Sequence, residues 1–196
     1  MTTFEYLAAL VSVVVGLGMA QTLRGLSHLV HGRASVRVHG PHLMWAANVM
    51  LWMVIFWWFS FGLVELPEWR LPDLIWVLLY ASGIYFLTSL VFPDPMPADF
   101  DGVSHFHDNR SWFFGALFCV GLLEVGDYWV KTIYQGVLPA QTGVQLALYL
   151  TLLGLWLPGS LVASRIRNDT FHWAYAIAFF IAEASWASYI SVWSGI

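Results

Sequence analysis

Carboxylates inside long apolar segments are the residues of this sequence with the clearest capacity for chemistry. Glu183 lies within AIAFFIAEASWASY (176–189), and Glu124 and Asp127 lie three residues apart in another apolar segment, which ends near Lys131. A charged carboxylate at the centre of a membrane-spanning helix costs about 2.5–3.5 kcal/mol, so it is expected to face water or the protein interior, or to be protonated. We therefore predict that Glu183 and Glu124 handle protons or cations, and that Asp127 and Lys131, one helical turn apart, form an ion pair.

Polar side chains nearer the opposite helix ends extend this set. On a rise of about 1.5 Å per helical residue, Asn48 and Gln21 fall at similar depths, with Arg24 beyond them. The candidate transport residues are Glu183, Glu124, Asp127, Asn48, Gln21 and Arg24. Two other interpretations of Glu183 stay open: a protonated carboxyl that donates one hydrogen bond to a neighbouring helix, and a contact with a partner or ligand.

Histidines and aspartates gather in and beside the connections between apolar segments. His28 and His31 are one helical turn apart, and the segment PDPMPADFDGVSHFHDNR (93–110) combines both residue types. Imidazole and carboxylate ligands in one region suit Zn²⁺ or another divalent metal. The predicted metal ligands are His28, His31, His105, His107, Asp101 and Asp108. The spacing matches no specific metal motif, so a solvated loop that contacts lipid headgroups is the alternative, and no cofactor is strongly implied.

Membrane helices must position these groups. Hydrophobic residues make up 59% of the 196 residues and charged residues 10%, with a mean hydropathy of +0.69, whereas a soluble domain has about 25% charged residues. One span needs about 20 apolar residues. We predict an all-α integral membrane protein with a single transmembrane domain over residues 1–196, built as a six-helix bundle that is compatible with three helical hairpins. The predicted spans are about 4–27, 43–65, 71–92, 112–134, 142–163 and 171–193.

The basic residues indicate an orientation for these spans. Most of the eight Lys and Arg residues fall in the connections after the first, third and fifth spans, and only Arg70 and Lys131 flank the opposite side. Cytoplasmic connections carry an excess of Lys and Arg. We therefore expect an inner membrane of bacterial type, with both termini on the non-cytoplasmic side.

Small residues repeat at helical spacing on two of the spans. They are Ala8, Ser12, Gly16 and Ala20 on the first span, and Ala174, Ala178 and Ala182 on the last. Such faces allow close helix approach, either within one chain or between subunits. We expect membrane lipids as partners and a homo-oligomer or a subunit of a larger membrane complex, with no role in nucleic-acid binding.

Three classes of function follow from these patterns. The preferred one is a small polytopic transporter or channel, linked to protons or cations through its intramembrane carboxylates. The alternative is a non-catalytic, oligomeric membrane subunit or scaffold that binds another membrane protein, lipid or an apolar cofactor. A metal-binding membrane enzyme with its His/Asp site on the cytoplasmic face is less favoured, because neither an H-E-x-x-H nor a G-x-S-x-G motif occurs.

Overall fold

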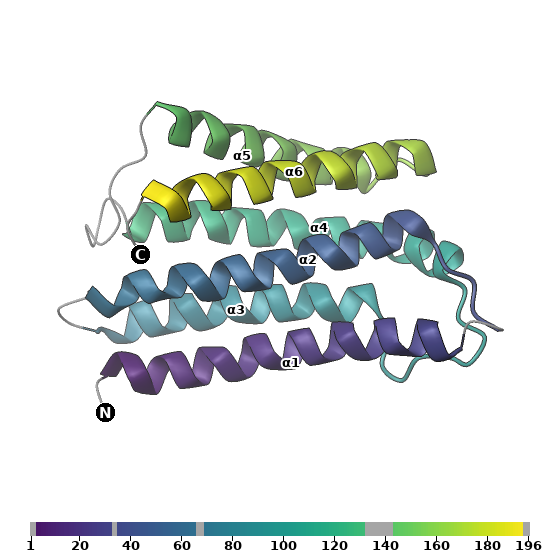
Figure 1. Cartoon of the computed structure of the whole chain (residues 1–196), viewed down its shortest axis with the longest axis horizontal. Coiled ribbons are helices and arrows are strands. Elements are labelled where there is room, and N and C mark those ends of the chain that lie inside the picture. Colours follow the sequence, from purple (N-terminus) through teal and green to yellow (C-terminus); the bar gives the residue numbers. More distant parts are fainter. Residues whose placement is uncertain (1–2, 33–34, 66–68, 132–142, 194–196) are drawn as a thin grey trace.

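Six α-helices form the architecture of the computed structural model (Figure 1), which describes residues 3–32, 35–65, 69–131 and 143–193. No strand occurs within these ranges, so the all-helical prediction is confirmed. The helices are α1 (Thr3–His31), α2 (Gly40–Phe59), α3 (Leu71–Val91), α4 (Gly102–Trp129), α5 (Val144–Ala163) and α6 (Asp169–Trp193), and a 3₁₀ helix, η1 (Ser60–Glu65), continues α2.

The start of α4 differs most from the prediction. The helix begins at Gly102, ten residues before the expected start of the span at 112. Asp101 caps it, since its side chain accepts hydrogen bonds from the backbone N–H groups of Val103 and Ser104. A capping carboxylate satisfies backbone donors that the first helical turn leaves without partners. The polar segment after Asp101, which the sequence placed in a loop, is therefore helical, and it carries His105 and His107 at fixed positions.

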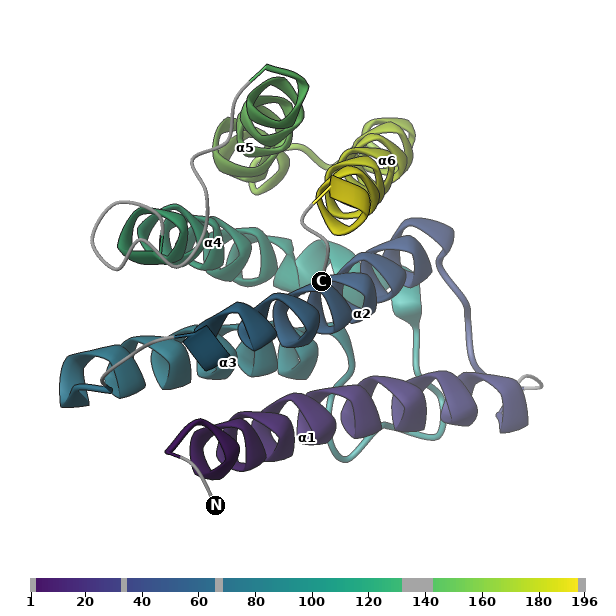
Figure 2. The same ribbon diagram turned by 60° about the vertical axis from the view of Figure 1, so that its left-hand side comes forward.

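The packing order of the helices departs from the chain order at α1 and α2. Helix α1 packs mainly against α3, α3 against α4, α4 against α5, and α5 against α6. Helix α2 lies between α1 and α6 and also contacts α3, as Figure 2 shows. The bundle therefore does not divide into three independent hairpins.

Hydrogen bonds cross between several of these packed helices. Asn48 Nδ2 on α2 donates to the carbonyl oxygen of Ala176 on α6 at 3.0 Å. Tyr175 on α6 donates to the carbonyl oxygen of Leu155 on α5 at 3.0 Å. Such bonds fix the rotation of α6 against its two neighbours, and so they determine which of its residues face the core.

The three connections in or beside which the histidines lie are at one end of the bundle. In Figure 1 the segments after α1, α3 and α5 are at the right, and the start of α1 and the end of α6 are at the left. The first two connections bond to each other, since Arg37 N donates to Phe100 O at 2.9 Å and Gly102 N donates to Arg37 O at 2.8 Å. We call this the histidine end; its assignment to the cytoplasmic side remains a prediction.

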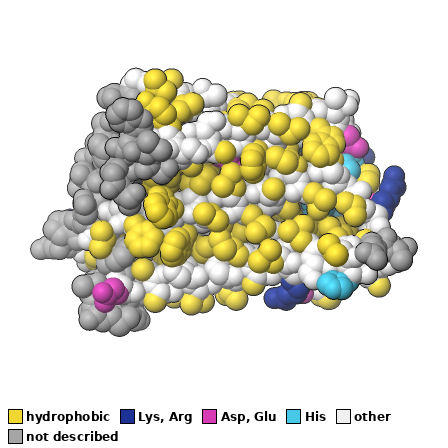
Figure 3. Space-filling view, in the orientation of Figure 1, with side chains coloured by type: hydrophobic (Ala, Val, Ile, Leu, Met, Phe, Trp, Pro, Cys, Tyr) yellow, Lys and Arg dark blue, Asp and Glu magenta, His cyan; other side chains and the backbone are white. Residues whose placement is uncertain are grey.

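Four helical segments of the described chain are long and apolar enough to cross a membrane. They are Leu7–His31, Gly40–Val64, Leu71–Val91 and Val144–Ala163. In Figure 3 apolar side chains cover the middle of the visible face, and the Lys, Arg and His side chains in view lie toward its right-hand end. This distribution fits a membrane-embedded protein. Helices α4 and α6 carry more polar residues, so the six-span arrangement stays a prediction.

Candidate functional site

Glu183 lies in the core of the bundle, in a layer of aromatic rings. Its side chain has no solvent exposure. Phe179 and Trp186, one turn before and after it on the same face of α6, both pack against tryptophans of other helices. The ring centroid of Phe179 lies 5.4 Å from that of Trp156 on α5, and the centroid of Trp186 lies 6.0 Å from that of Trp52 on α2. The neighbours of Glu183 on this face of α6 are therefore packed against α2 and α5.

Neither carboxylate oxygen of Glu183 has a hydrogen-bond partner among the residues that the structure describes. A buried polar group without a partner costs about 1–3 kcal/mol or more, and native proteins hold few of them. The alternative interpretation, in which Glu183 has a structural role, requires a hydrogen bond from its protonated carboxyl group to a neighbouring helix. The described part of the chain contains no such bond.

Glu124 has a different environment on α4. Tyr80 on α3 donates its hydroxyl proton to Glu124 Oε2 at 2.7 Å, and Trp52 Nε1 on α2 donates to the Tyr80 hydroxyl at 3.1 Å. These two bonds join three helices through a buried chain of donors and acceptors. Glu124 therefore has a structural contact that the sequence did not reveal, because its two partners come from distant segments.

Asp127, about one turn further along α4, forms the predicted ion pair with Lys131, which lies two residues past the end of this helix. The distance between Lys131 Nζ and Asp127 Oδ2 is 2.6 Å, and both side chains are buried. This confirms the pairing that the spacing indicated. Lys131 provides the counter-charge for Asp127. The prediction that Asp127 takes part in transport therefore depends only on its closeness to Glu124 in the sequence.

The remaining candidate transport residues are separate from these carboxylates. Asn48 donates to α6, Gln21 Nε2 lies 3.4 Å from Phe92 O, and Arg24 pairs with Asp94 at 3.3 Å. The cavity beside Asn48 measures ≈ 10 Å³ and is lined mostly by apolar side chains, which is at the lower limit for one water molecule. Among the described residues, no hydrogen bond joins these three side chains to Glu183 or Glu124.

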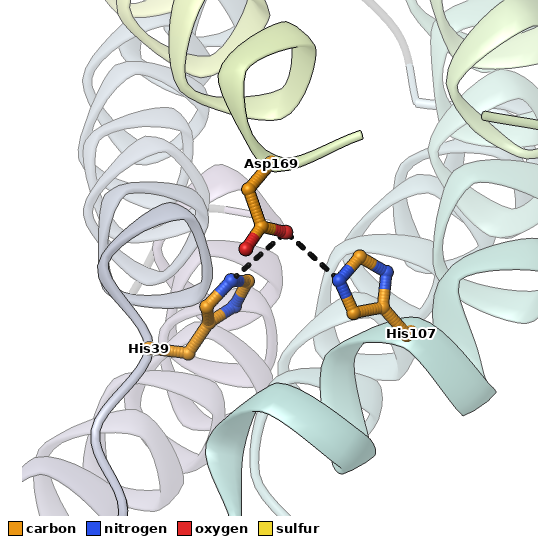
Figure 4. Close-up of side chains that lie close together, drawn as sticks. All are labelled: His39, His107 and Asp169. Atoms are coloured by element: carbon orange, nitrogen blue, oxygen red, sulfur yellow. Dashed lines mark hydrogen bonds and ion pairs between the residues drawn. The ribbon is translucent and has the colours of Figure 1, made fainter. Parts of the chain in front are cut away.

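A cluster of two histidines and one aspartate forms at the histidine end (Figure 4). His107 Nε2 lies 2.8 Å from Asp169 Oδ1, and His39 Nε2 lies 3.3 Å from the same oxygen. The ligand atoms of the three residues are all within 4.8 Å of one another. We refer to His39, His107 and Asp169 as the His/Asp cluster.

Three separate elements position the His/Asp cluster. Asp169 is the first residue of α6, His107 lies in the second turn of α4, and His39 directly precedes α2. The backbone bridge between Arg37 and Asp101 holds the segment before His39 against the start of α4. Cluster geometry therefore depends on the caps and loops of this end rather than on the apolar core.

The pKa shifts of His39 and Asp169 favour the protonation states that bind a cation. Burial lowers the pKa of His39 below its usual value, although the neighbouring Asp169 acts in the opposite direction. Burial alone would raise the pKa of Asp169, but the hydrogen bond from His107 and the nearby His39 imidazole outweigh it and keep that pKa below its usual value. A neutral imidazole and an ionised carboxylate are the forms that coordinate metals.

The structure distributes the predicted metal ligands over several places. Only His107 belongs to the His/Asp cluster. His31 Nδ1 bonds within α1 to the carbonyl oxygen of Ser27 at 2.7 Å, Asp101 caps α4, and His105 Nε2 lies 3.3 Å from Leu90 O. The described contacts do not bring His28 or the exposed Asp108 to this cluster.

Sequence reasoning missed His39 and Asp169 as candidate ligands. Each lies just before a predicted even-numbered span, on the same side as His107. That shared position was the available signal, because helices that run in the same direction start at the same end of a bundle.

The small-residue faces are only partly used within the chain. Gly16 and Ala20 are exposed, and a Cβ atom added at Gly16 would have no neighbour within 4 Å. The buried face of α1 instead contains Val11, Val15 and Gly18. On α6, Ala182 is buried, whereas Ala174 is exposed. Packing within one chain therefore does not explain why small residues occupy positions 16 and 20.

Comparisons of the chain with protein-family models, with curated proteins and with solved structures gave no match.

Proposed function

We propose that this protein is a small membrane transporter or channel for protons or another cation, with Glu183 as its central titrating group. The observation that carries the proposal is the complete burial of Glu183 with both oxygens unpartnered among the described residues. Ionisable residues within membrane proteins are costly, and they mark ion and proton pathways. A carboxylate that contributes no described hydrogen bond offers little stability in return for this cost.

The closed bundle corresponds to a proton-loaded state in this proposal. An ionised carboxylate with no counter-charge is strongly disfavoured in apolar surroundings, whereas a protonated one is tolerated. Release of the proton then requires water or an acceptor to reach Glu183, by a movement of α6 relative to α2 or α5. Glu124 has a secondary role, since Tyr80 already occupies one of its oxygens.

A non-catalytic oligomeric subunit is the second candidate function. The observation that favours it is the open small-residue face of α1, where Gly16 and Ala20 are exposed. Faces of this kind allow close helix–helix contact in membranes. A homo-oligomer is compatible with both candidates, so the decisive property is ion flux.

Proteoliposomes containing a pH-sensitive dye test the transport proposal. Under an imposed pH gradient, and with K⁺, Na⁺ or Mg²⁺ as alternative cations, the wild-type protein should produce flux above that of empty liposomes. Glu183→Gln should abolish it, and Glu183→Asp should retain flux with an altered pH dependence because it keeps a titratable group. Glu5→Gln, which changes an exposed glutamate of α1 in the same way, is the matched control.

Two results would overturn the proposal. Unchanged flux in the Glu183→Gln variant removes Glu183 from the pathway. Absence of flux for every tested cation in the wild type excludes transport of those ions and shifts the assignment to the subunit, for which Gly16→Leu should change the oligomer mass measured in detergent.

A further inference from the structure

We infer that the His/Asp cluster is a binding site for one divalent transition-metal ion, with Zn²⁺ as the representative ion. Two imidazoles and one carboxylate make up a donor set that is common for zinc and for other divalent transition metals. The site is independent of Glu183 and of the transport proposal. Its residues come from three elements, and two of them were not among the ligands that sequence reasoning selected.

The two distances from the Asp169 oxygen to the histidine nitrogens lie near those that a metal ion would impose. Tetrahedral bonds of about 2.0–2.1 Å to nitrogen and oxygen place neighbouring ligand atoms about 3.3 Å apart. His39 Nε2 already lies 3.3 Å from Asp169 Oδ1, while His107 Nε2 lies 2.8 Å from it. Binding therefore requires the second distance to open by about 0.5 Å, which small side-chain rotations can supply.

Charge and burial also favour a cation at this position. Histidines coordinate metals in the neutral form and carboxylates in the ionised form, so the metal-binding form of this donor set has a charge of −1 and attracts a divalent ion. His39 is buried, and the side chain of Asp169 is 51% exposed. The buried side holds the ligands in place and the exposed side admits the ion. Three protein ligands with one side toward solvent leave a coordination position for water, as in open zinc sites.

The cluster differs in this respect from the other histidines of the same end. His42 Nε2 lies 2.6 Å from Val91 O, and His172 Nε2 lies 2.8 Å from Ile166 O. Backbone carbonyl oxygens therefore already occupy a ring nitrogen of each. In the His/Asp cluster, both Nε2 atoms point toward one carboxylate oxygen, as Figure 4 shows.

A metal ion at this site would join the start of α6 to the starts of α2 and α4. Helices α2 and α6 already pack closely against each other, whereas α2 and α4 have only a small contact. The ion would thus add a cross-link at the histidine end. Resistance to thermal unfolding should rise with Zn²⁺ concentration, because a ligand that binds only the folded state stabilises it.

Metal titration of the full chain in detergent tests the inference. After treatment with a chelator, the protein is titrated with Zn²⁺ by calorimetry and with Co²⁺ by visible absorption, and Mg²⁺ serves as the hard-cation comparison. We expect one Zn²⁺ per chain and Co²⁺ spectra with imidazole and carboxylate ligands. Asp169→Asn, His107→Ala and His39→Ala should each weaken binding by at least about tenfold, since even the loss of an outer-shell partner has an effect of this size.

The double variant His28→Ala/His31→Ala is the matched control, because it removes two histidines of the same end that lie outside the cluster. Its Zn²⁺ affinity should equal that of the wild type. Helical circular dichroism identifies variants that fail to fold, and Asp169→Asn keeps the shape of its side chain. X-ray absorption of the Zn²⁺-loaded wild type gives a result that does not depend on any variant.

Three results would overturn the inference. They are absence of stoichiometric Zn²⁺ binding in the wild type, equal affinity in the folded Asp169→Asn protein, and loss of binding in the His28→Ala/His31→Ala control. None of these outcomes involves ion flux, so failure of the metal site and failure of the transport proposal are distinguishable.

Discussion

Glu124 and Glu183 are both buried carboxylates on long helices, but their surroundings are opposite. Glu124 accepts a hydrogen bond from Tyr80, which in turn accepts one from Trp52. Glu183 has no exposure and no described partner. Burial alone therefore does not distinguish these two carboxylates. The presence of partners does, because a bonded carboxylate stabilises the fold and an unbonded one destabilises it.

The helices that carry these two residues share a further property. Of the six helices, α4 and α6 are the two outside the set of sufficiently apolar spans. Both are nevertheless packed into the bundle, α4 against α3 and α5, and α6 against α2 and α5. Their polar content is tolerated because neighbouring helices, rather than lipid, cover the carboxylates.

The largest expected effect concerns the Asp127–Lys131 ion pair, which lies beside Glu124 in the sequence. Lys131→Met leaves Asp127 buried without its cation, and breaking a buried pair in this way costs about 3–5 kcal/mol. The free energy of unfolding can be measured by SDS titration in mixed micelles, followed by tryptophan fluorescence. Adding Asp127→Asn to the same protein should restore most of the loss. A loss below about 1 kcal/mol would indicate a solvated, weak pair.

Replacing Glu124 and Glu183 separately by methionine, which has a similar shape, should change the free energy of unfolding in opposite directions. Glu124→Met leaves the Tyr80 hydroxyl without its acceptor and should lower the free energy of unfolding by about 1–3 kcal/mol. Glu183→Met removes an unpartnered polar group and should raise that free energy by a similar amount, about 1–3 kcal/mol. The same unfolding titration measures both. A decrease for both variants would contradict the distinction between the two carboxylates.

The smallest expected effect is the contribution of one hydrogen bond, that from Trp52 to Tyr80, measured apart from the loss of side-chain volume. Trp52 Nε1 donates to Tyr80, whereas the buried Nε1 of Trp45 has no partner among the described residues. Trp52→Phe and Trp45→Phe remove similar volumes, so the difference between their unfolding free energies reports the bond. We expect Trp52→Phe to be more destabilising by about 1 kcal/mol. Equal values would mean that the Tyr80–Glu124 chain does not depend on Trp52.

Local patterns predicted much of the fold and one of the polar contacts. The helices of Figure 1 fall close to the apolar segments, and the Asp127–Lys131 pair follows from a spacing of four residues. Prediction failed at the start of α4, where a polar sequence suggested a loop. There the Asp101 cap and contacts with residues before α2 stabilise a helix that hydropathy does not reveal.

The candidate sites were less predictable, because their members are distant in the sequence. His107 and Asp169 are separated by 62 positions, and their contact depends on where the starts of α4 and α6 meet. Tyr80 and Glu124 are separated by 44 positions. Periodicity locates a residue on its own helix, but it carries no information about the helix opposite.

By itself, the sequence determined the helical class, the approximate positions of the helices and the presence of carboxylates within apolar segments, since these follow from hydropathy and from backbone hydrogen bonding in an apolar medium. Only the tertiary structure decided which carboxylate has a partner and which histidines meet an aspartate. The physical reason is that both outcomes depend on the rotation and order of packed helices, which are set by contacts between distant segments.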